Sequence, residues 1–103
     1  MARAYEISVW KPHVGKRSAF LKSWAEVSAI FKDNGVSDIL VLNGHAGKDV
    51  GNIVIIQTFK SLTDNGAVND AIGESAAMKA WMEKNKDLDS AVMISHDLYS
   101  EEA

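Results

Sequence analysis

The stretch 38-DILVLNGHAGKDVGNIVIIQTF-59 decides the fold of this chain. It holds two apolar runs rich in β-branched residues, 38–45 and 52–59, and a short segment, 47–51, that begins and ends with glycine. Runs of this length and composition predict strands. The segment between them predicts a hairpin loop. Both runs are apolar on both of their faces, so the sheet they form is expected to need cover on both sides.

One strand and one helix are expected before this hairpin. The run 5–10 alternates between apolar and other residues, which predicts a half-buried strand that ends before Pro12. Over 16–34, apolar residues recur at spacings of three and four, as they do on one face of an amphipathic helix. Asn34 and Gly35 follow, and they supply the left-handed stop that such a helix needs.

A second helix and a fourth strand are expected after the hairpin. The segment 61–64 (SLTD) resembles a capping box and predicts a helix through Ile72. The apolar stripe continues over 76–84, after an interruption near Gly73, and its Trp81 is expected to be a core residue. The run 88–99 predicts the last strand, and 100–103 is expected to be a frayed end.

The order of these elements, βαββαβ, predicts an α+β domain of the ferredoxin-like class that spans residues 1–103. Right-handed crossovers place both helices on one face of an antiparallel sheet, with strand order 4-1-3-2. A four-stranded apolar face is then left bare. It exceeds the patch of ~300–600 Å² that a monomer tolerates and is of the size, roughly 800 Å² per partner, of a standard interface. We therefore expect a homodimer joined through the sheet faces.

Composition argues against several classes of function. The net charge of -3 comes with no basic stripe, and the third strand has no aromatic residue before its terminal Phe59, so we expect no binding to nucleic acid. The chain has no cysteine and no pair of histidines at ligand spacing, so we expect no metal and no cofactor. No run approaches ~18 apolar residues and no signal sequence is apparent, so we expect no membrane segment and a cytoplasmic location.

One polar cluster is expected where the first and second strands end at the same edge of the sheet. There Trp10 approaches Asn43 and His45, which interrupt an otherwise apolar strand. The His45 imidazole can accept a proton from a phenol or enol near neutral pH. Asn43 can polarise a carbonyl, and Trp10 can stack on a flat substrate. Alternatively, His45 ends an edge strand in solvent and Trp10 packs in the dimer contact.

A second cluster is expected near the opposite edge, where Glu6 lies close to Gln57 and His96. Four residues along a strand span ~13 Å, so we expect that one small ligand does not reach both clusters. Period-two alternation puts His96 on the face of Val92 and Ile94, where a core or strand-end histidine is more common than a haem ligand.

Glu6 is expected to point away from the face that carries Tyr5, Ile7 and Val9 and toward the subunit contact or barrel lumen. A carboxylate that loses its hydration there has a raised pKa and can act as a base. The alternative is an ion pair with Arg3, Lys11 or a side chain of the partner.

The stretch 5–16 (YEISVWKPHVGK), followed by Phe20 and Trp24, resembles the opening of proteins of the dimeric α/β-barrel superfamily. It is most similar to the NIPSNAP-like and antibiotic-biosynthesis-monooxygenase-like branches. The resemblance extends to Phe59 and to the segmented second helix, and so covers nearly the whole chain. The resemblance implies a pocket between sheet and helices or at the barrel centre. It implies no single reaction, since members of the superfamily range from cofactor-free oxygenases to isomerases and haem-degrading enzymes. Haem degraders carry Asn on the first strand, where this chain has Glu6 and Ser8, which argues against that activity here.

Two functions follow as hypotheses. The first is a cofactor-independent monooxygenase or isomerase that acts on an apolar or aromatic substrate by proton abstraction, with His45 as base and Asn43 as polariser. The second is a non-catalytic ligand-binding or assembly domain in which the same residues only fill a lumen. In either case the ligand is expected to be a small apolar molecule.

Overall fold

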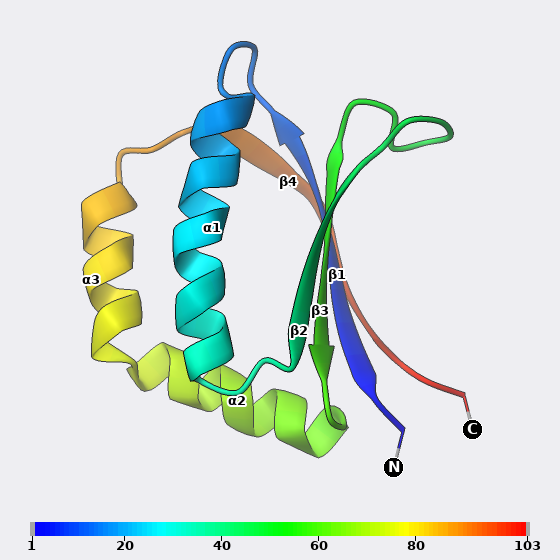
Figure 1. Ribbon diagram of the computed structural model, residues 1–103, viewed down its shortest axis with the longest axis vertical. Helices are drawn as coiled ribbons and strands as arrows, with labels where there is room; N and C mark the ends of the chain where they lie inside the picture. Colours follow the sequence, from blue (N-terminus) through cyan, green and yellow to red (C-terminus); the bar gives the residue numbers. More distant parts are fainter. Residues whose placement is uncertain (1, 103) are drawn as a thin grey trace.

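A four-stranded antiparallel sheet carries the helices on one of its faces and leaves the other face open (Figure 1). The computed structural model describes residues 2–102. Its elements in chain order are β1 (Ala4–Pro12), α1 (Arg17–Asp33), β2 (Asp38–Asn43), β3 (Ile53–Phe59), α2 (Leu62–Glu74), α3 (Ala76–Asn85) and β4 (Ala91–Ser100). The strand order β2-β3-β1-β4 and the ferredoxin-like topology confirm the prediction. No helix within residues 2–102 is long and apolar enough to cross a bilayer.

The second helical pattern forms two helices that change direction at Ser75. Ser61 begins α2 by accepting a hydrogen bond from the Asp64 amide at 3.0 Å, as the capping pattern predicts. Ser75 takes an extended conformation, and its Oγ accepts from the Met78 amide at 3.2 Å. The chain therefore breaks at a new serine cap two residues after Gly73, and α3 turns up beside α1 (Figure 1).

Gly35 lets the chain leave α1, as predicted. Its φ is +113°, and a Cβ at this position would lie 2.9 Å from Cγ2 of Val68 on α2. Glycine is thus needed both for the left-handed turn and for the close approach of α2.

The register of the sheet decides which side chains face the helices. In β3 the odd-numbered residues are buried, among them Ile53 and Gln57. Glu6 pairs with Gln57 and Trp10 pairs with Ile53, so the even-numbered residues of β1 face the helices too. This corrects the expectation for Glu6, which points into the layer between sheet and helices and not toward a subunit contact. The sequence shows the alternation of β1, but it does not show which face of the strand meets the helices.

A bulge in β4 changes the direction of His96. Val9 pairs with Ser95 and Trp10 pairs with Met93, so Ile94 is an extra residue in the strand. His96 therefore shares the helix side with Met93, and the period-two expectation that grouped it with Ile94 was wrong. Counted from Met93 without the extra residue, His96 would fall on the open face, whereas its pairing with Ser8 puts it on the helix face.

The open face of the sheet is apolar, as predicted. Leu40, Leu42, Val92, Ile94 and Tyr99 each have between 44% and 54% of their surface exposed there. Such a row of large apolar side chains on one flat surface is unusual for a monomer.

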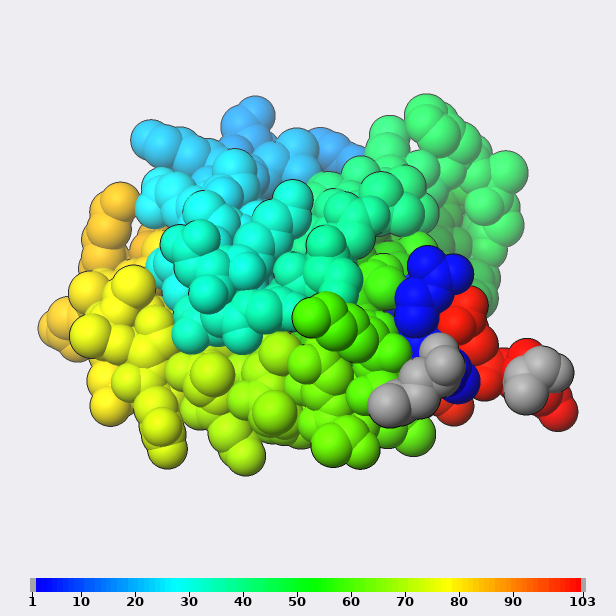
Figure 2. Space-filling view, turned by 60° about the horizontal axis from the view of Figure 1, so that its bottom comes forward, coloured from blue at the N-terminus to red at the C-terminus, as the bar shows by residue number. Residues whose placement is uncertain are grey.

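The two ends of the chain lie side by side, as Figure 2 shows. The Glu101 amide donates to the Arg3 carbonyl at 2.9 Å, and the two side chains form an ion pair at 3.1 Å. The side-chain hydrogen bond from Arg3 lowers the pKa of Glu101 to about 2. The stretch 100–103, expected to fray, is therefore anchored as far as Glu101, while Ala103 lies outside the described residues.

Candidate functional site

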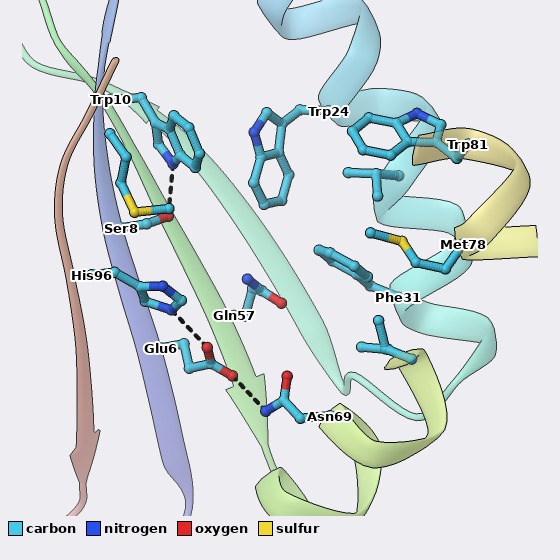
Figure 3. A pocket seen from close by; sticks show the side chains of 13 residues that line it. Glu6, Ser8, Trp10, Trp24, Phe31, Gln57, Asn69, Met78, Trp81 and His96 are labelled. Carbon is cyan, nitrogen blue, oxygen red and sulfur yellow. Dashed lines mark hydrogen bonds and ion pairs between the residues drawn. The ribbon is translucent and has the colours of Figure 1, made fainter. Parts of the chain in front are cut away.

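A cavity of about 290 Å³ lies between the sheet and the helices (Figure 3). Strands supply most of its polar side chains, namely Glu6, Ser8, Gln57 and His96. The helices supply most of its apolar wall. One end of the cavity is therefore polar and the other aromatic, which is the usual composition of a site for a small organic molecule.

Glu6 is the centre of the polar end. Its Oε1 lies 2.7 Å from Nε2 of His96 on the neighbouring strand β4. Its Oε2 accepts hydrogen bonds from Nδ2 of Asn65 at 2.7 Å and from Nδ2 of Asn69 at 3.0 Å, both on α2. Only 12% of the Glu6 side chain is exposed, whereas 43% of the His96 side chain is.

These contacts fix the charge of Glu6. Burial by itself raises the pKa of a carboxyl group, but hydrogen bonds from Asn69, His96 and Asn65 outweigh it and lower the pKa of Glu6 below its ordinary value of 4.5. The carboxylate is therefore charged at neutral pH. The expectation that Glu6 has a raised pKa and acts as a base is therefore wrong.

Aromatic rings close the other end of the cavity. Trp10 lies 5.3 Å from Phe20 and 6.1 Å from Trp24 between ring centroids, and Trp24 lies 5.8 Å from Phe31. The Trp10 indole N–H donates to Oγ of Ser8 at 2.9 Å, which turns the ring along β1 toward Glu6. Trp81 of α3 stands across the cavity from Trp10 (Figure 3).

The structure brings together four of the residues proposed from the sequence: Trp10, Glu6, Gln57 and His96 all line the cavity. Trp10 was expected in a separate cluster from Glu6. Its large ring extends along β1 toward Glu6, so the two residues line the same cavity.

Asn43 and His45 lie outside this cavity. Trp10 and Asn43 both pair with Ile53, one on each side of β3, but Oδ1 of Asn43 accepts from Arg17 at 2.7 Å at the edge of the sheet. His45 is exposed in the loop that follows β2. A catalytic role for these two residues stays a prediction, to which the geometry of the cavity adds nothing.

Asn65, Asn69 and Trp81 belong to the site, and sequence reasoning did not propose them. Asparagine is a poor helix former, yet the spacing of four residues between Asn65 and Asn69 puts both amides on one face of α2. That spacing is the signal that could have found them. Trp81 was assigned to the core, as a tryptophan in a helical apolar stripe usually is.

The arrangement fits general acid–base chemistry on an organic molecule. Within residues 2–102, no group of three or more His, Cys, Asp or Glu side chains could hold a metal ion. The Glu6–His96 pair joins a charged carboxylate to an imidazole beside an apolar chamber, a combination that can orient a base and stabilise the charge it gains.

Comparisons with known proteins identify the fold. No protein-family model and no curated protein matches the chain. Solved structures do match. A NIPSNAP family protein of unknown function from Agrobacterium tumefaciens has a TM-score of 0.67 at 18% identity, over 98% of this chain and 87% of that one.

Two further matches are to proteins with oxygenase names. SnoaB, a cofactor-independent oxygenase from Streptomyces nogalater, has a TM-score of 0.73 at 13% identity, over 100% of this chain and 96% of that one. A putative antibiotic biosynthesis monooxygenase from Chloroflexus aurantiacus has a TM-score of 0.66 at 16% identity, over 98% and 94%. The predicted resemblance in fold to NIPSNAP-like and antibiotic-biosynthesis-monooxygenase-like proteins is thus confirmed, and at these identities it is a likeness of fold alone.

Proposed function

We propose that this protein binds a small aromatic molecule between its sheet and helices and removes a proton from it. In this proposal the protein is a cofactor-independent monooxygenase or isomerase. The observation that carries the proposal is the hydrogen bond of 2.7 Å between Glu6 and His96 at the polar end of an otherwise apolar cavity. The fold likeness to a cofactor-independent oxygenase adds support by analogy.

His96 takes the role of base that the sequence assigned to His45. With Nε2 protonated and donating to Glu6, Nδ1 of the imidazole is the nitrogen that accepts a proton from a phenol, an enol or an acidic C–H bond. Glu6 holds the ring in this tautomer and stabilises the imidazolium that forms. In this proposal Gln57, which is buried and lines the sheet side of the cavity, donates to the developing oxyanion.

The fate of the anion distinguishes the two reactions. An isomerase returns the proton from His96 to another atom of the same molecule, so no other reactant is needed. A monooxygenase lets the electron-rich anion reduce dioxygen, with one oxygen atom retained in the product and the other released as water. In both reactions the base begins and ends the cycle in the same protonation state.

A non-catalytic binding domain is the second candidate. The network around Glu6 favours it, because three side-chain donors on a buried carboxylate are also what a purely structural hydrogen-bond network contains. In that case the cavity binds a ligand without accelerating any proton transfer.

5-Nitrobenzisoxazole separates the two candidates. A base removes one C–H proton from this compound while its N–O bond breaks, and the coloured phenolate reports the rate. We expect the wild-type protein to accelerate this step and His96→Gln to lower the rate about 10²-fold, the usual contribution of a positioned base. His45→Gln is the matched control and should leave the rate within about twofold, because His45 is exposed and outside the cavity.

Binding is measured separately, with 2-naphthol as the ligand. All three tryptophans of the chain line the cavity, so a ligand that enters it is expected to quench the tryptophan fluorescence. If 2-naphthol binds and His96→Gln reacts as fast as the wild type, the protein is a binding domain. If 2-naphthol does not bind at millimolar concentration, both candidates are contradicted.

We also propose that the working unit is a homodimer whose sheets meet through their open faces. The proposal is supported by the exposed apolar side chains of that face, Leu40 and Ile94 among them. The cytoplasmic location stays a prediction from the sequence.

A further inference from the structure

A second cavity, of about 320 Å³, lies behind the aromatic wall of the first. Trp10, Trp24 and Trp81 line both cavities, and we call these three residues the tryptophan partition. On the far side of the partition the second cavity is bounded by the end of α3 and the segment before β4, where Leu88 lies. The partition is thus the common wall of two spaces, each large enough for part of an organic molecule.

The partition contains an unsatisfied donor. Among the residues that the structure describes, Nε1 of Trp81 is the buried side-chain nitrogen or oxygen atom that has no hydrogen-bond partner. Figure 3 shows this nitrogen on the edge of the indole that is turned away from Met78 and Phe31. A buried N–H without an acceptor has lost its hydrogen bonds to water and has formed no other in their place. A ligand acceptor that reaches this edge therefore forms a hydrogen bond with a donor that was already desolvated when the protein folded.

Trp81 is also the member of the partition that comes from the least buried element. Trp10 is tied to Ser8 by a hydrogen bond and packs on two rings, and Trp24 packs between Trp10 and Phe31. Trp81 comes from α3, none of whose described residues is fully buried. Elements with few buried contacts open at the lowest free-energy cost.

From these observations we infer that the two cavities are two halves of one ligand site and that Trp81 is a specificity-determining residue of it. The ligand is an elongated aromatic molecule with a hydroxyl group at Glu6–His96 and an acceptor oxygen, such as a carbonyl, that receives the Trp81 N–H. The inference rests on the proposed function, since it assumes that the ligand hydroxyl lies beside His96 of the Glu6–His96 pair. Glu6 and Trp10 are four residues apart on β1, or ~13 Å along the strand, so a ligand that extends from Glu6 past Trp10 into the second cavity is about as long as two joined rings.

Two ligands of matched size test the hydrogen bond. 4-Acetyl-4′-hydroxybiphenyl carries the carbonyl oxygen, and 4-ethyl-4′-hydroxybiphenyl lacks it. By titration calorimetry, we expect the acetyl compound to bind the wild-type protein about tenfold more tightly, the value of one hydrogen bond between neutral groups. In Trp81→Phe, which keeps a ring but loses the N–H, the two compounds should bind equally.

A blocking variant tests the second cavity. Leu88→Trp fills this cavity and leaves the first unchanged, since Leu88 lines only the second of the two. We expect it to weaken binding of the acetyl compound at least tenfold and to leave 2-naphthol, which fits within one cavity, within twofold. Leu62→Trp is the matched control: Leu62 is a similarly exposed leucine on α2 that lines neither cavity.

The outcomes separate this inference from the proposed function. Equal binding of the two biphenyls to the wild type, or a preference for the acetyl compound that survives in Trp81→Phe, would overturn the role of Trp81. Unchanged binding in Leu88→Trp would overturn the second half of the site. In each of these cases 2-naphthol still binds, whereas failure of 2-naphthol to bind would overturn the proposed function and this inference together.

Discussion

Glu6 holds a charge at the polar end of a largely apolar cavity, and its hydrogen bonds decide what that charge does for stability. Because its pKa in the folded protein lies below the ordinary value of 4.5, the folded state binds a proton less readily than the unfolded state does. Glu6 therefore stabilises the fold above about pH 4.5. This contribution is lost as the pH falls below that value and passes through the lower pKa of the folded state.

We expect Glu6→Gln to reduce the free energy of unfolding by about 1–3 kcal/mol at neutral pH, because a neutral amide is a weaker acceptor for three donors. The deficit relative to wild type should shrink at about pH 3, where the wild-type carboxylate is itself becoming protonated. Urea unfolding at the two pH values measures it. Glu74→Gln, at the exposed end of α2, is the control and should change neither value by more than about 0.5 kcal/mol. A deficit that does not depend on pH would contradict the stabilising role of the Glu6 charge.

The pairing of Glu6 with His96 was within reach of sequence reasoning, because the start of β1 and the end of β4 must meet in an antiparallel sheet. Its position facing the helices was not. For Glu6 this position depends on the register of β1 against β3. For His96 it depends on Ile94, which looks like any other apolar strand residue and becomes the bulge only when β4 pairs with β1. Likewise, β2 ends at Asn43, so His45 lies in the loop and not in the sheet, although the expected strand extended to residue 45.

At the scale of elements, local signals were sufficient for the end of α1 and the start of α2. Ser61 and Gly35 act at the positions where the sequence predicts a cap and a stop, because both depend on a single residue and its immediate neighbours. The break at Ser75 was predicted two residues early, at Gly73. Glycine marks a weak point in a helix, whereas the serine side chain caps the helix that follows.

Two glycine-to-alanine substitutions should have opposite effects on the free energy of unfolding. Gly35→Ala puts a side chain where φ is +113° and Val68 is 2.9 Å away, so we expect a loss of about 1–3 kcal/mol. Gly66→Ala lies inside α2 with no atom within 4 Å of the added Cβ, so we expect a gain of about 0.4–1 kcal/mol. Thermal and urea unfolding measure both. Destabilisation by Gly66→Ala would show that α2 packs more tightly on its neighbours than these contacts indicate.

At the scale of the whole molecule, the two faces of the sheet have different roles. One face meets the helices and forms the cavity, while the other presents a row of large apolar side chains about half exposed. A standard interface covers roughly 800 Å² per partner, and a four-stranded face is expected to be of that size. A second copy of the same chain is the occupant that we propose, because two flat faces with the same apolar surface complement each other in an isologous contact.

Leu40→Lys tests this arrangement. Leu40 lies on β2 with 48% of its surface exposed, on the face away from the helices, so a lysine there is readily accommodated by a monomer but places a charge within the sheet-to-sheet contact. We expect the wild type to sediment as a dimer at micromolar concentration and Leu40→Lys to dissociate at least tenfold more readily, with an unchanged circular dichroism spectrum. Leu62→Lys carries the same change at an equally exposed leucine on α2 and should remain a dimer. A wild-type protein that sediments as a monomer would contradict the dimer while leaving the cavity between sheet and helices intact, since both halves of that cavity are built from one chain.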